Sequence, residues 1–259
     1  MPFTVLLALL TLLGTHAAST GYDGLSKKCP SSNSVLVRPP PTLDIKSPAN
    51  EKWIPAPIGF TYGHWWVTHS SNPAYFQIAN FQYDSYPVFP SGSYPGLPSN
   101  ANINASNPPT IDLVSWNSIN TSNPEIFTGF GYDYLRSDVP NVINFRGTGR
   151  LSEVANSLEM LAWGFDTDSV EWFVTYETTV PPSNATSGYA ACLDINYRKK
   201  NGPRDETYSA IIKAIKDLCV PHLTTLAKQT RVLPTDNRRD GLPPVACDEA
   251  CVENAIIFR

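Results

Sequence analysis

Short segments in which hydrophobic and polar residues alternate follow one another through the middle of the chain. Between Val170 and Thr179, one set of alternate positions carries Val, Trp, Val and Tyr, and the other carries Glu, Phe, Thr and Glu. Successive side chains of a strand point to opposite faces of a sheet, so this pattern predicts a strand with two different faces. Similar segments predict strands at 62–69, 75–83, 110–117, 141–146, 151–154, 157–163 and 189–197. The short turns between most of them favour an antiparallel meander.

One helix is expected after the last strand. From Asp205 to Cys219 the apolar residues recur at the three- and four-residue spacing of a helix with one buried stripe. Asp205 can cap the N-terminus of this helix, and Pro221 is expected to stop it. A series of strands followed by one late helix predicts a mainly β protein, in which a small closed barrel carries the helix on its outside. Such barrels commonly hold a small molecule.

Composition divides the chain into four regions. Residues 1–18 contain an apolar core followed by small residues, which predicts a secretory signal peptide. The Pro-rich residues 19–58 predict an extended arm, and residues 59–220 hold the barrel and its helix. Residues 221–259 are expected to form a polar C-terminal tail. Within the barrel region, the segment from Pro87 to Pro109 predicts a long loop that could cover the barrel mouth.

Glycosylation motifs and composition favour secretion. Asn104, Asn120 and Asn184 each begin an Asn-X-Ser/Thr sequon in a segment of loop-like composition. Charged residues make up 16% of the chain, below the ~25% of an average soluble domain. The net charge of −4 provides no basic surface for a nucleic acid, so a nucleic-acid partner is not expected. No later segment is long and apolar enough to suggest a span across a membrane.

The five cysteines are expected to pair in part, because the predicted compartment is oxidising. Their number is odd, so at least one thiol stays free or pairs between chains. We expect Cys29 and Cys219 each to pair with one of Cys247 and Cys251. Cys192 lies in the middle of a predicted strand and is expected to be a buried free thiol. The spacing alone does not determine the connectivity.

None of the familiar catalytic signatures occurs in the chain. It has no Gly-x-Ser-x-Gly elbow, no phosphate-binding loop and no His-Glu-x-x-His motif, and Gly129 and Gly131 are interpreted as isolated turn glycines. We therefore expect no cofactor. After the signal peptide, the histidines are His64, His69 and His222, without metal-ligand spacing, so we expect no metal site.

Polar residues within the predicted strands are the candidates for catalysis. His69 comes first because imidazole titrates near physiological pH, with a buried structural histidine as the alternative, whereas His64 on the opposite face is a weaker candidate. Arg146 and Glu159 lie in adjacent predicted strands. They would form either a structural ion pair or an anchor for an enol, carboxylate or carbonyl group of a ligand. We expect His69, Arg146 and Glu159 to be the catalytic residues.

The expected ligand-binding residues combine aromatic walls with a few polar groups. They are Thr68, Tyr83, Asn144, Trp163, Tyr176 and Asp194. Asn144 would supply a further hydrogen bond, and Asp194 is either a base or a solvated carboxylate. A slip of one residue exchanges the two faces of a strand, so the pattern does not decide which face lines a cavity.

Several motifs, in a fixed order, resemble those of a fungal lipocalin-like (calycin) family. They are WVTHS at 66–70, NFRGTGRL at 144–151, SLEMLAWG at 157–164 and EWFVTY at 171–176, followed by Asp194, Ile195 and the helix. The resemblance covers residues 59–220. It implies an eight-stranded antiparallel barrel with one C-terminal amphipathic helix and a buried cavity for a hydrophobic molecule.

The expected function is the binding of a small hydrophobic or aromatic metabolite, in the secretory pathway or outside the cell. Because no cofactor motif occurs, we expect a cofactor-independent cyclase, pericyclase or isomerase of secondary metabolism that holds its substrate in a reactive conformer. Two alternatives stay open: a carrier that releases its ligand unchanged, and an extracellular interaction protein with a solid barrel. Polar groups that converge inside a cavity would favour the enzyme over the carrier.

Overall fold

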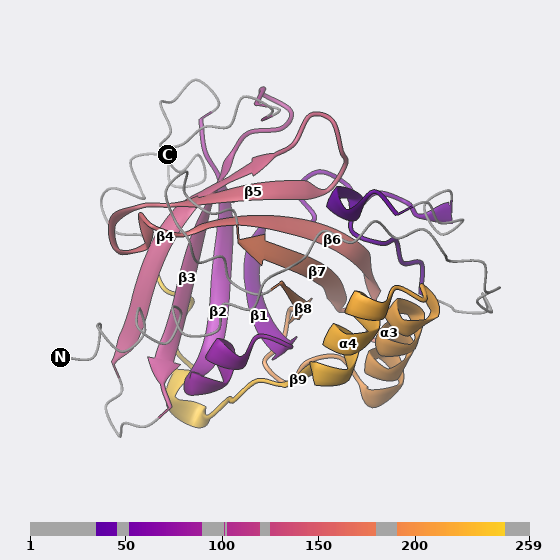
Figure 1. Ribbon diagram of the computed structural model, residues 1–259. Helices are drawn as coiled ribbons and strands as arrows, with labels where there is room; N and C mark the ends of the chain where they lie inside the picture. Colours follow the sequence, from indigo (N-terminus) through magenta and orange to yellow (C-terminus); the bar gives the residue numbers. More distant parts are fainter. Residues whose placement is uncertain are drawn as a thin grey trace.

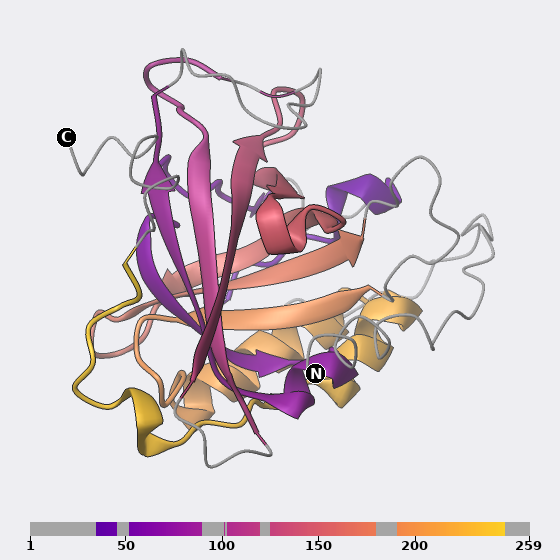
Figure 2. The same cartoon turned by 90° about the vertical axis from the view of Figure 1, so that its left-hand side faces the viewer.

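The structure is a closed barrel of antiparallel strands with two helices packed against one side (Figures 1 and 2). This computed structural model describes residues 35–45, 52–89, 101, 103–119, 125–179 and 191–246. Strands β2 to β8 pair in sequence order, and β1 pairs with both β2 and β8, which closes the sheet. The barrel strands are β1 (Gly63–Ser70), β2 (Ile78–Pro87), β3 (Thr110–Ser118), β4 (Ile126–Leu135), β5 (Val142–Gly147), β6 (Ala155–Phe165), β7 (Glu171–Thr179) and β8 (Cys192–Tyr197).

This arrangement confirms the mainly β class and the eight-stranded, lipocalin-like barrel. Each barrel strand pairs antiparallel with its neighbours, as a meander requires. The segment predicted as a strand at 75–83 is divided in the structure. Its first part belongs to a short 3-10 helix, η2 (Pro73–Gln77), and β2 starts directly after it. The side chain of Asn72 accepts a hydrogen bond from the Ala74 amide and so caps η2.

Strand β4 is absent from the sequence prediction, which interpreted Gly129 and Gly131 as turn glycines. A Cβ atom on Gly131 would lie 2.4 Å from the carbonyl oxygen of Arg146 and 2.4 Å from the ring of Phe145. One on Gly129 would lie 2.8 Å from Leu151. These glycines therefore lie within a strand, where Gly131 allows close approach of β5 and Gly129 allows close approach of η3 (Gly149–Leu151). The predicted strand at 151–154 is also wrong, because that segment is the end of η3 and the turn after it.

Two helices follow the barrel where one was expected. Helix α3 (Asp205–Asp217) confirms the predicted helix, and α4 (Pro221–Gln229) is a second one. Pro221, which was expected to stop the helix, is the first residue of α4, a position where its missing amide hydrogen breaks no helical hydrogen bond. Cys219 has a φ of 55°, which turns the chain between the two helices. Neither helix combines the length and the apolar character needed to cross a membrane, and this holds for the described residues as a whole.

Helices α3 and α4 cover the outer face of strands β6 to β8 (Figure 1). Ile211 and Ile215 of α3 and Leu223 of α4 are fully buried there. The strand residues in this cluster are Leu161, Ala162, Trp172, Val174, Tyr176, Leu193, Ile195 and Tyr197. Alternate residues of β7 and β8 thus face the helices, so the residues between them point into the barrel.

Aromatic residues and one arginine close the barrel end at which β1 begins. Trp65 is fully buried and packs edge-on against Phe173, with 4.6 Å between the ring centroids. The guanidinium carbon of Arg198 lies 3.6 Å from the centroid of the Trp65 ring. Arg198 also donates hydrogen bonds to the carbonyl oxygen of Tyr62 at 2.9 Å and to the carboxylate of Glu171 at 2.6 Å. The segment before β1 is therefore tied to the end of β8.

The described part of the expected N-terminal arm packs on the barrel. The amide of Arg38 donates to the carbonyl oxygen of Leu161 at 2.9 Å, and its side-chain Nε donates to that of Met160 at 2.9 Å. The Arg38 guanidinium also stacks over the ring of Trp53 at 3.8 Å. These contacts make the described arm residues a part of the folded barrel unit.

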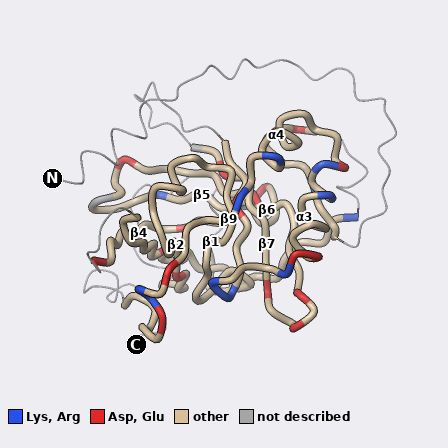
Figure 3. The backbone as a smooth tube through the Cα atoms, turned by 90° about the horizontal axis from the view of Figure 1, so that it is seen from below, with Lys and Arg blue, Asp and Glu red and all other residues tan. Residues whose placement is uncertain are grey.

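The chain after α4 also returns to the barrel. Strand β9 (Arg231–Val232) pairs with β1, and the side chain of Asn80 donates to Asp236 at 2.8 Å. Arg239 donates to the side-chain oxygen of Gln82 at 2.8 Å. Acidic and basic residues are interspersed along the backbone of the barrel and the helices (Figure 3). The C-terminal region expected to be a tail therefore contributes ordered structure through residue 246.

Candidate functional site

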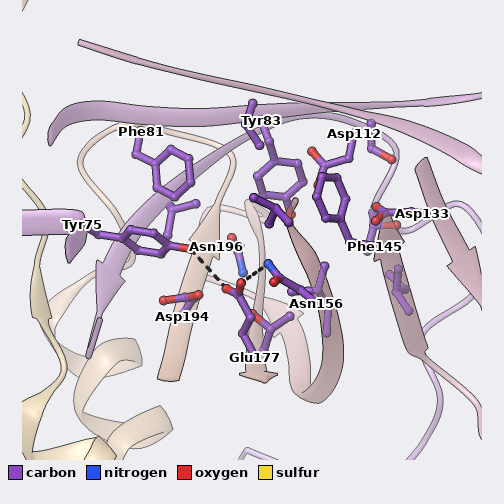
Figure 4. A pocket seen from close by; sticks show the side chains of 18 of the residues that line it. Tyr75, Phe81, Tyr83, Asp112, Asp133, Phe145, Asn156, Glu177, Asp194 and Asn196 are labelled. Atoms are coloured by element: carbon purple, nitrogen blue, oxygen red, sulfur yellow. Dashed lines mark hydrogen bonds between the residues drawn. The ribbon is translucent and has the colours of Figure 1, made fainter. Parts of the chain in front are cut away.

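A cavity of about 210 Å³ occupies the inside of the barrel (Figure 4). Its walls are mostly apolar, and six of the lining side chains are Phe81, Val114, Trp116, Phe145, Leu158 and Phe173. Ala74 and Tyr75 of η2, which connects β1 to β2, also line the cavity. A barrel cavity with such walls suits a small hydrophobic ligand.

Four carboxyl groups line this cavity. They belong to Asp112 on β3, Asp133 on β4, Glu177 on β7 and Asp194 on β8. Glu177 and Asp194 occupy positions of β7 and β8 that alternate with the residues packed under the helices. No Lys, Arg or His occurs among the described residues that line the cavity. An ionised carboxylate is unfavourable in such surroundings, because the walls are largely apolar and no side chain of the described lining compensates its charge.

Glu177 and Asp194 form a hydrogen-bonded acid pair on one side of the cavity. One carboxyl oxygen of Glu177 accepts a hydrogen bond from the amide of Asn156, and the other accepts one from the Tyr75 hydroxyl at 3.3 Å (Figure 4). Asp194 accepts a hydrogen bond from the Ser70 hydroxyl. The two carboxyl groups also hydrogen-bond each other. Residues from β1, η2, β6, β7 and β8 therefore hold this pair in place.

The acid pair favours one shared proton. Burial, and then the charge of Asp194, raise the pKa of Glu177 well above its usual range. Burial also raises the pKa of Asp194, but hydrogen bonds from Ser70, Glu177 and Cys192 oppose that rise. Glu177 is thus the better proton holder and Asp194 the better carboxylate, so that an acid and a base lie side by side.

Cys192 lies directly beside the acid pair. Its Sγ is 3.8 Å from a carboxyl oxygen of Glu177 and 3.6 Å from one of Asp194. The three side chains bring ligand atoms within 4.8 Å of one another, a spacing that could hold a metal ion. Burial, and then the charge of Asp194, raise the pKa of the Cys192 thiol, which disfavours the thiolate that a metal requires. The hydrogen bonds already present explain the cluster better as an acid pair.

Asp112 and Asp133 lie together on the other side of the cavity (Figure 4). Asp112 pairs with Ser85 of β2 on one side and with Gly131 of β4 on the other. Asp133 follows Gly131 by two positions and therefore lies on the same face of the sheet as Asp112. Burial, with a contribution from the charge of Asp84, raises the pKa of Asp112 to about 7. Burial, and then the charge of Asp112, raise the pKa of Asp133 well above its usual range. Among the described residues that line the cavity, no cation offsets the burial of these two groups.

Comparison with known proteins places the chain in a family. No protein-family model matches it. It is 31% identical over 231 residues to the botcinic acid biosynthesis cluster B protein 12 of Botryotinia fuckeliana (strain B05.10), an alignment that covers 88% of this chain and 96% of that protein. The chain belongs to the family of this cluster protein.

Solved structures with a similar fold include two barrels. Apocrustacyanin C1 aligns with 13% identity and a TM-score of 0.43, over 69% of this chain and 79% of that chain. The siderocalin Ex-FABP aligns with 11% identity and a TM-score of 0.38, over 73% of this chain and 96% of that chain.

Two of the residues predicted to contact a ligand line the barrel cavity of this family member. They are Tyr83 and Asp194. Tyr83 lies beside Asp112 and Asp133, whose charges, after burial, help to raise its pKa well above the usual range. Its phenol therefore stays neutral. Asp194 belongs to the acid pair with Glu177 and is buried.

His69 lies outside the cavity, on the side of the barrel that the helices cover. The register of β1 against β8 shifts between Val67 and His69, and Val67 lines the cavity. The His69 ring instead stacks on Tyr208 of α3, with 4.5 Å between the ring centroids. Burial lowers the pKa of His69 to about 4, so its imidazole is neutral near physiological pH. This is the surrounding of a structural histidine.

Arg146 and Glu159 do not line the cavity, and the ion pair expected between them is not formed. Glu159 is opposite Val142, whereas Arg146 is opposite Ala155 at the other end of the β5–β6 pair. Glu159 is fully buried beneath the arm, where the amide of Thr42 donates to its carboxylate at 2.9 Å. Burial raises the pKa of Glu159, and this bond and the charge of Arg38 oppose the rise. The bonding partners of Glu159 are thus in the arm.

The remaining ligand-binding candidates also lie away from the cavity walls. The Thr68 hydroxyl donates to the carbonyl oxygen of Ile195 at 3.2 Å, and Asn144 sits between two cavity-lining residues of β5 and so points outward. Trp163 donates to a carbonyl oxygen of the arm, and Tyr176 belongs to the cluster under the helices. The strands that carry these candidates were predicted from the sequence, but the face of each strand that points into the barrel was not.

Sequence reasoning missed Asp112, Asp133 and Glu177. A signal for Glu177 is present, because it alternates with Trp172, Val174 and Tyr176, which form a continuous apolar face. If that face is assigned to the helices, Glu177 points inward. No comparable signal marks Asp133, because the strand that carries it was not recognised.

The glycosylation and cysteine predictions are mostly outside the described residues. Asn104 lies in an exposed turn, where its side-chain oxygen accepts a hydrogen bond from the Ser106 amide at 3.0 Å. Cys192 is a buried free thiol, as expected, and Cys219 is disulfide-bonded. The residues outside the described ranges are Cys29, Asn120, Asn184, Cys247 and Cys251.

Proposed function

We propose that this protein binds a small hydrophobic metabolite inside its barrel and catalyses a cofactor-independent cyclisation or isomerisation of it. The observation that carries the proposal is the acid pair of Glu177 and Asp194, which faces a cavity with largely apolar walls. Membership in the family of a botcinic acid biosynthesis cluster protein supports a role in secondary-metabolite biosynthesis.

The acid pair provides both proton transfers that an isomerisation needs. Glu177 donates its proton to a carbonyl oxygen or an alkene carbon of the substrate, and Asp194 accepts a proton from a second substrate atom. The pair holds one proton before and after the reaction, so the charges balance and no external reactant is consumed. The first step requires a protonated carboxyl group, and the raised pKa of Glu177 favours that form.

The surroundings of the acid pair support this assignment. Tyr75 and Asn156 hold the two oxygens of Glu177, and Ser70 holds Asp194, so the carboxyl groups are oriented before a substrate binds. The largely apolar walls confine a flexible substrate to few conformers, which favours ring closure.

Conversion of a native substrate tests the proposal. An extract from a culture of the producing organism that lacks the gene is incubated with the purified protein, and the mixture is followed by liquid chromatography and mass spectrometry. We expect the wild type to convert at least one compound into an isomer of the same mass. Glu177→Gln should reduce the rate by roughly 100-fold or more. The matched control is Glu153→Gln, because Glu153 is exposed and is not one of the residues that line the cavity.

The result that contradicts catalysis is conversion by Glu177→Gln at the wild-type rate. If both proteins retain the same compound in native mass spectra and neither changes it, the protein is a carrier. If neither retains any compound, the interaction-protein alternative gains support. Circular dichroism of each variant establishes that the barrel is folded.

We further propose that the protein works in the secretory pathway or outside the cell. The apolar N-terminal segment, the three sequons and the exposed position of Asn104 support this location. Enzymatic deglycosylation of the protein from the native host, followed by mass measurement, tests it. An unglycosylated protein that retains residues 1–18 and stays inside the cell would overturn it.

A further inference from the structure

The side of the cavity opposite the acid pair carries buried polar atoms whose hydrogen-bonding capacity is not used within the described residues. Oδ1 of Asp112, Oδ1 of Asp133 and the hydroxyl of Ser85 have no hydrogen-bond partner among the described residues. Their side chains are 8%, 9% and 2% exposed, so they are withdrawn from bulk water. All three residues line the cavity. Buried polar atoms without partners are rare in folded proteins, and each one needs an explanation.

The three residues are neighbours on the inner face of the sheet. Ser85 and Asp112 are direct neighbours across the β2–β3 pair, and Asp133 is the diagonal neighbour of Asp112 across the β3–β4 pair. Figure 4 shows Asp112 and Asp133 close together, with Tyr83 and Phe145 beside them. A single polar group of a ligand could therefore contact all three residues.

The chemistry of the three residues indicates which ligand would fit. Carboxylate oxygens only accept hydrogen bonds, and a hydroxyl can accept as well as donate. The described lining has no Lys, Arg or His, so a positive charge inside the cavity must come from the ligand. A primary ammonium group offers three N–H donors to Asp112, Asp133 and Ser85. Its positive charge also favours the ionised form of the two carboxyl groups, whose pKa values burial raises while the cavity holds no cation.

We propose that Asp112, Asp133 and Ser85 form an anchoring site for the primary ammonium group of a hydrophobic amine. This assignment names a substrate class for the proposed function. It rests on one part of that function, namely that the substrate binds in the barrel cavity. The ammonium group is held at this side, and the apolar remainder extends along Phe145 toward the acid pair. A ligand with a carboxyl group fits this side less well, because it places a further acid beside Asp112 and Asp133 and brings no N–H donor.

Three probes that differ only in their polar group test the anchoring site. Octylamine, 1-octanol and octanoate are titrated near neutral pH, and binding is followed by calorimetry and by the fluorescence of Trp116, which lines the cavity. We expect octylamine to bind roughly tenfold more tightly than octanol, since charge-assisted hydrogen bonds are about twice as strong as neutral ones. Octanoate should bind most weakly.

Variants then assign the preference to the site. Asp112→Asn combined with Asp133→Asn should abolish the preference for the amine and leave the affinity for octanol within about twofold, because the apolar contacts are unchanged. Unchanged octanol binding also shows that the cavity is intact. Ser85→Ala, which removes one acceptor at a small volume change, should weaken octylamine binding about threefold and serves if the double variant does not fold.

Two results would overturn the anchoring site. The first is that octanol or octanoate binds the wild type as tightly as octylamine does. The second is that the double variant still prefers the amine, which would assign the effect to the acid pair or to the net negative charge of the protein. Either result leaves the conversion experiment with Glu177→Gln unaffected, so failure of the anchoring site is distinguishable from failure of the proposed function.

Discussion

Replacement of Asp112 by Asn should remove a loss of folding stability that the wild type shows as pH rises. Asp112 is buried on β3 without a cation beside it, and its pKa is raised from 3.8 to about 7. The folded protein therefore binds the proton of Asp112 more tightly than the unfolded chain does. Stability from this proton is fully present below about pH 4 and is lost as pH rises through about 7.

The magnitude follows from the size of the shift. A rise of the pKa from 3.8 to about 7 is worth about 4 kcal/mol, because each pKa unit corresponds to ~1.4 kcal/mol. Asn does not titrate, so Asp112→Asn removes this loss. The free energy of unfolding of the variant, relative to the wild type, should therefore increase by about 4 kcal/mol between about pH 4 and about pH 8. Poorer hydrogen bonding of the Asn amide lowers stability by a constant amount and leaves this difference unchanged.

Urea unfolding followed by tryptophan fluorescence, repeated across this pH range, measures the effect. The control is Asp44→Asn, the same chemical change at an exposed position whose φ of 47° suits Asn as well as Asp. Its pH profile should parallel that of the wild type. The reasoning about burial is refuted if the Asp112→Asn profile also runs parallel to the wild type, because Asp112 would then titrate normally in the folded protein.

Three further predictions concern the barrel itself. Gly131→Ala should lower the free energy of unfolding by about 2 kcal/mol in urea titrations, because the added Cβ meets the ring of Phe145 at 2.4 Å; unchanged stability would show that the strands separate freely there. Arg198→Met should lower stability by about 2–4 kcal/mol and alter the emission of Trp65, which loses its stacked guanidinium. An unchanged spectrum would contradict that contact. The thiol of Cys192 should resist iodoacetamide in the native protein and react after unfolding, as peptide mass spectrometry can show, because burial raises its pKa. Rapid native alkylation would mean that the cavity is open beside the acid pair.

The two faces of individual strands could be read from the sequence. In β7, the alternation of Trp172, Val174 and Tyr176 with Phe173 and Glu177 separates the face under the helices from the face that lines the cavity. Strand β8 and helix α3 were recognised for the same reason, since their periods of two and of about three to four residues depend only on local geometry. A recognisable order of such segments was enough to predict the barrel.

Tertiary structure alone decided which face points inward and which strands meet. The register shift in β1 places His69 against Tyr208 of α3, although the pattern of the strand groups it with Val67. Strand β4 escaped recognition because Gly131 is needed for close approach to Phe145, a contact between segments distant in sequence.

The candidate site shows the same division between local and long-range information. Glu159 and Glu177 are both glutamates in predicted strands, yet one is bonded to the arm and the other faces the cavity. The sequence determined the alternation, the late helix and the absence of familiar catalytic motifs. Only closure of the barrel placed Asp112 and Asp133 across one cavity from Glu177 and Asp194, because β3 and β4 are far from β7 and β8 along the chain.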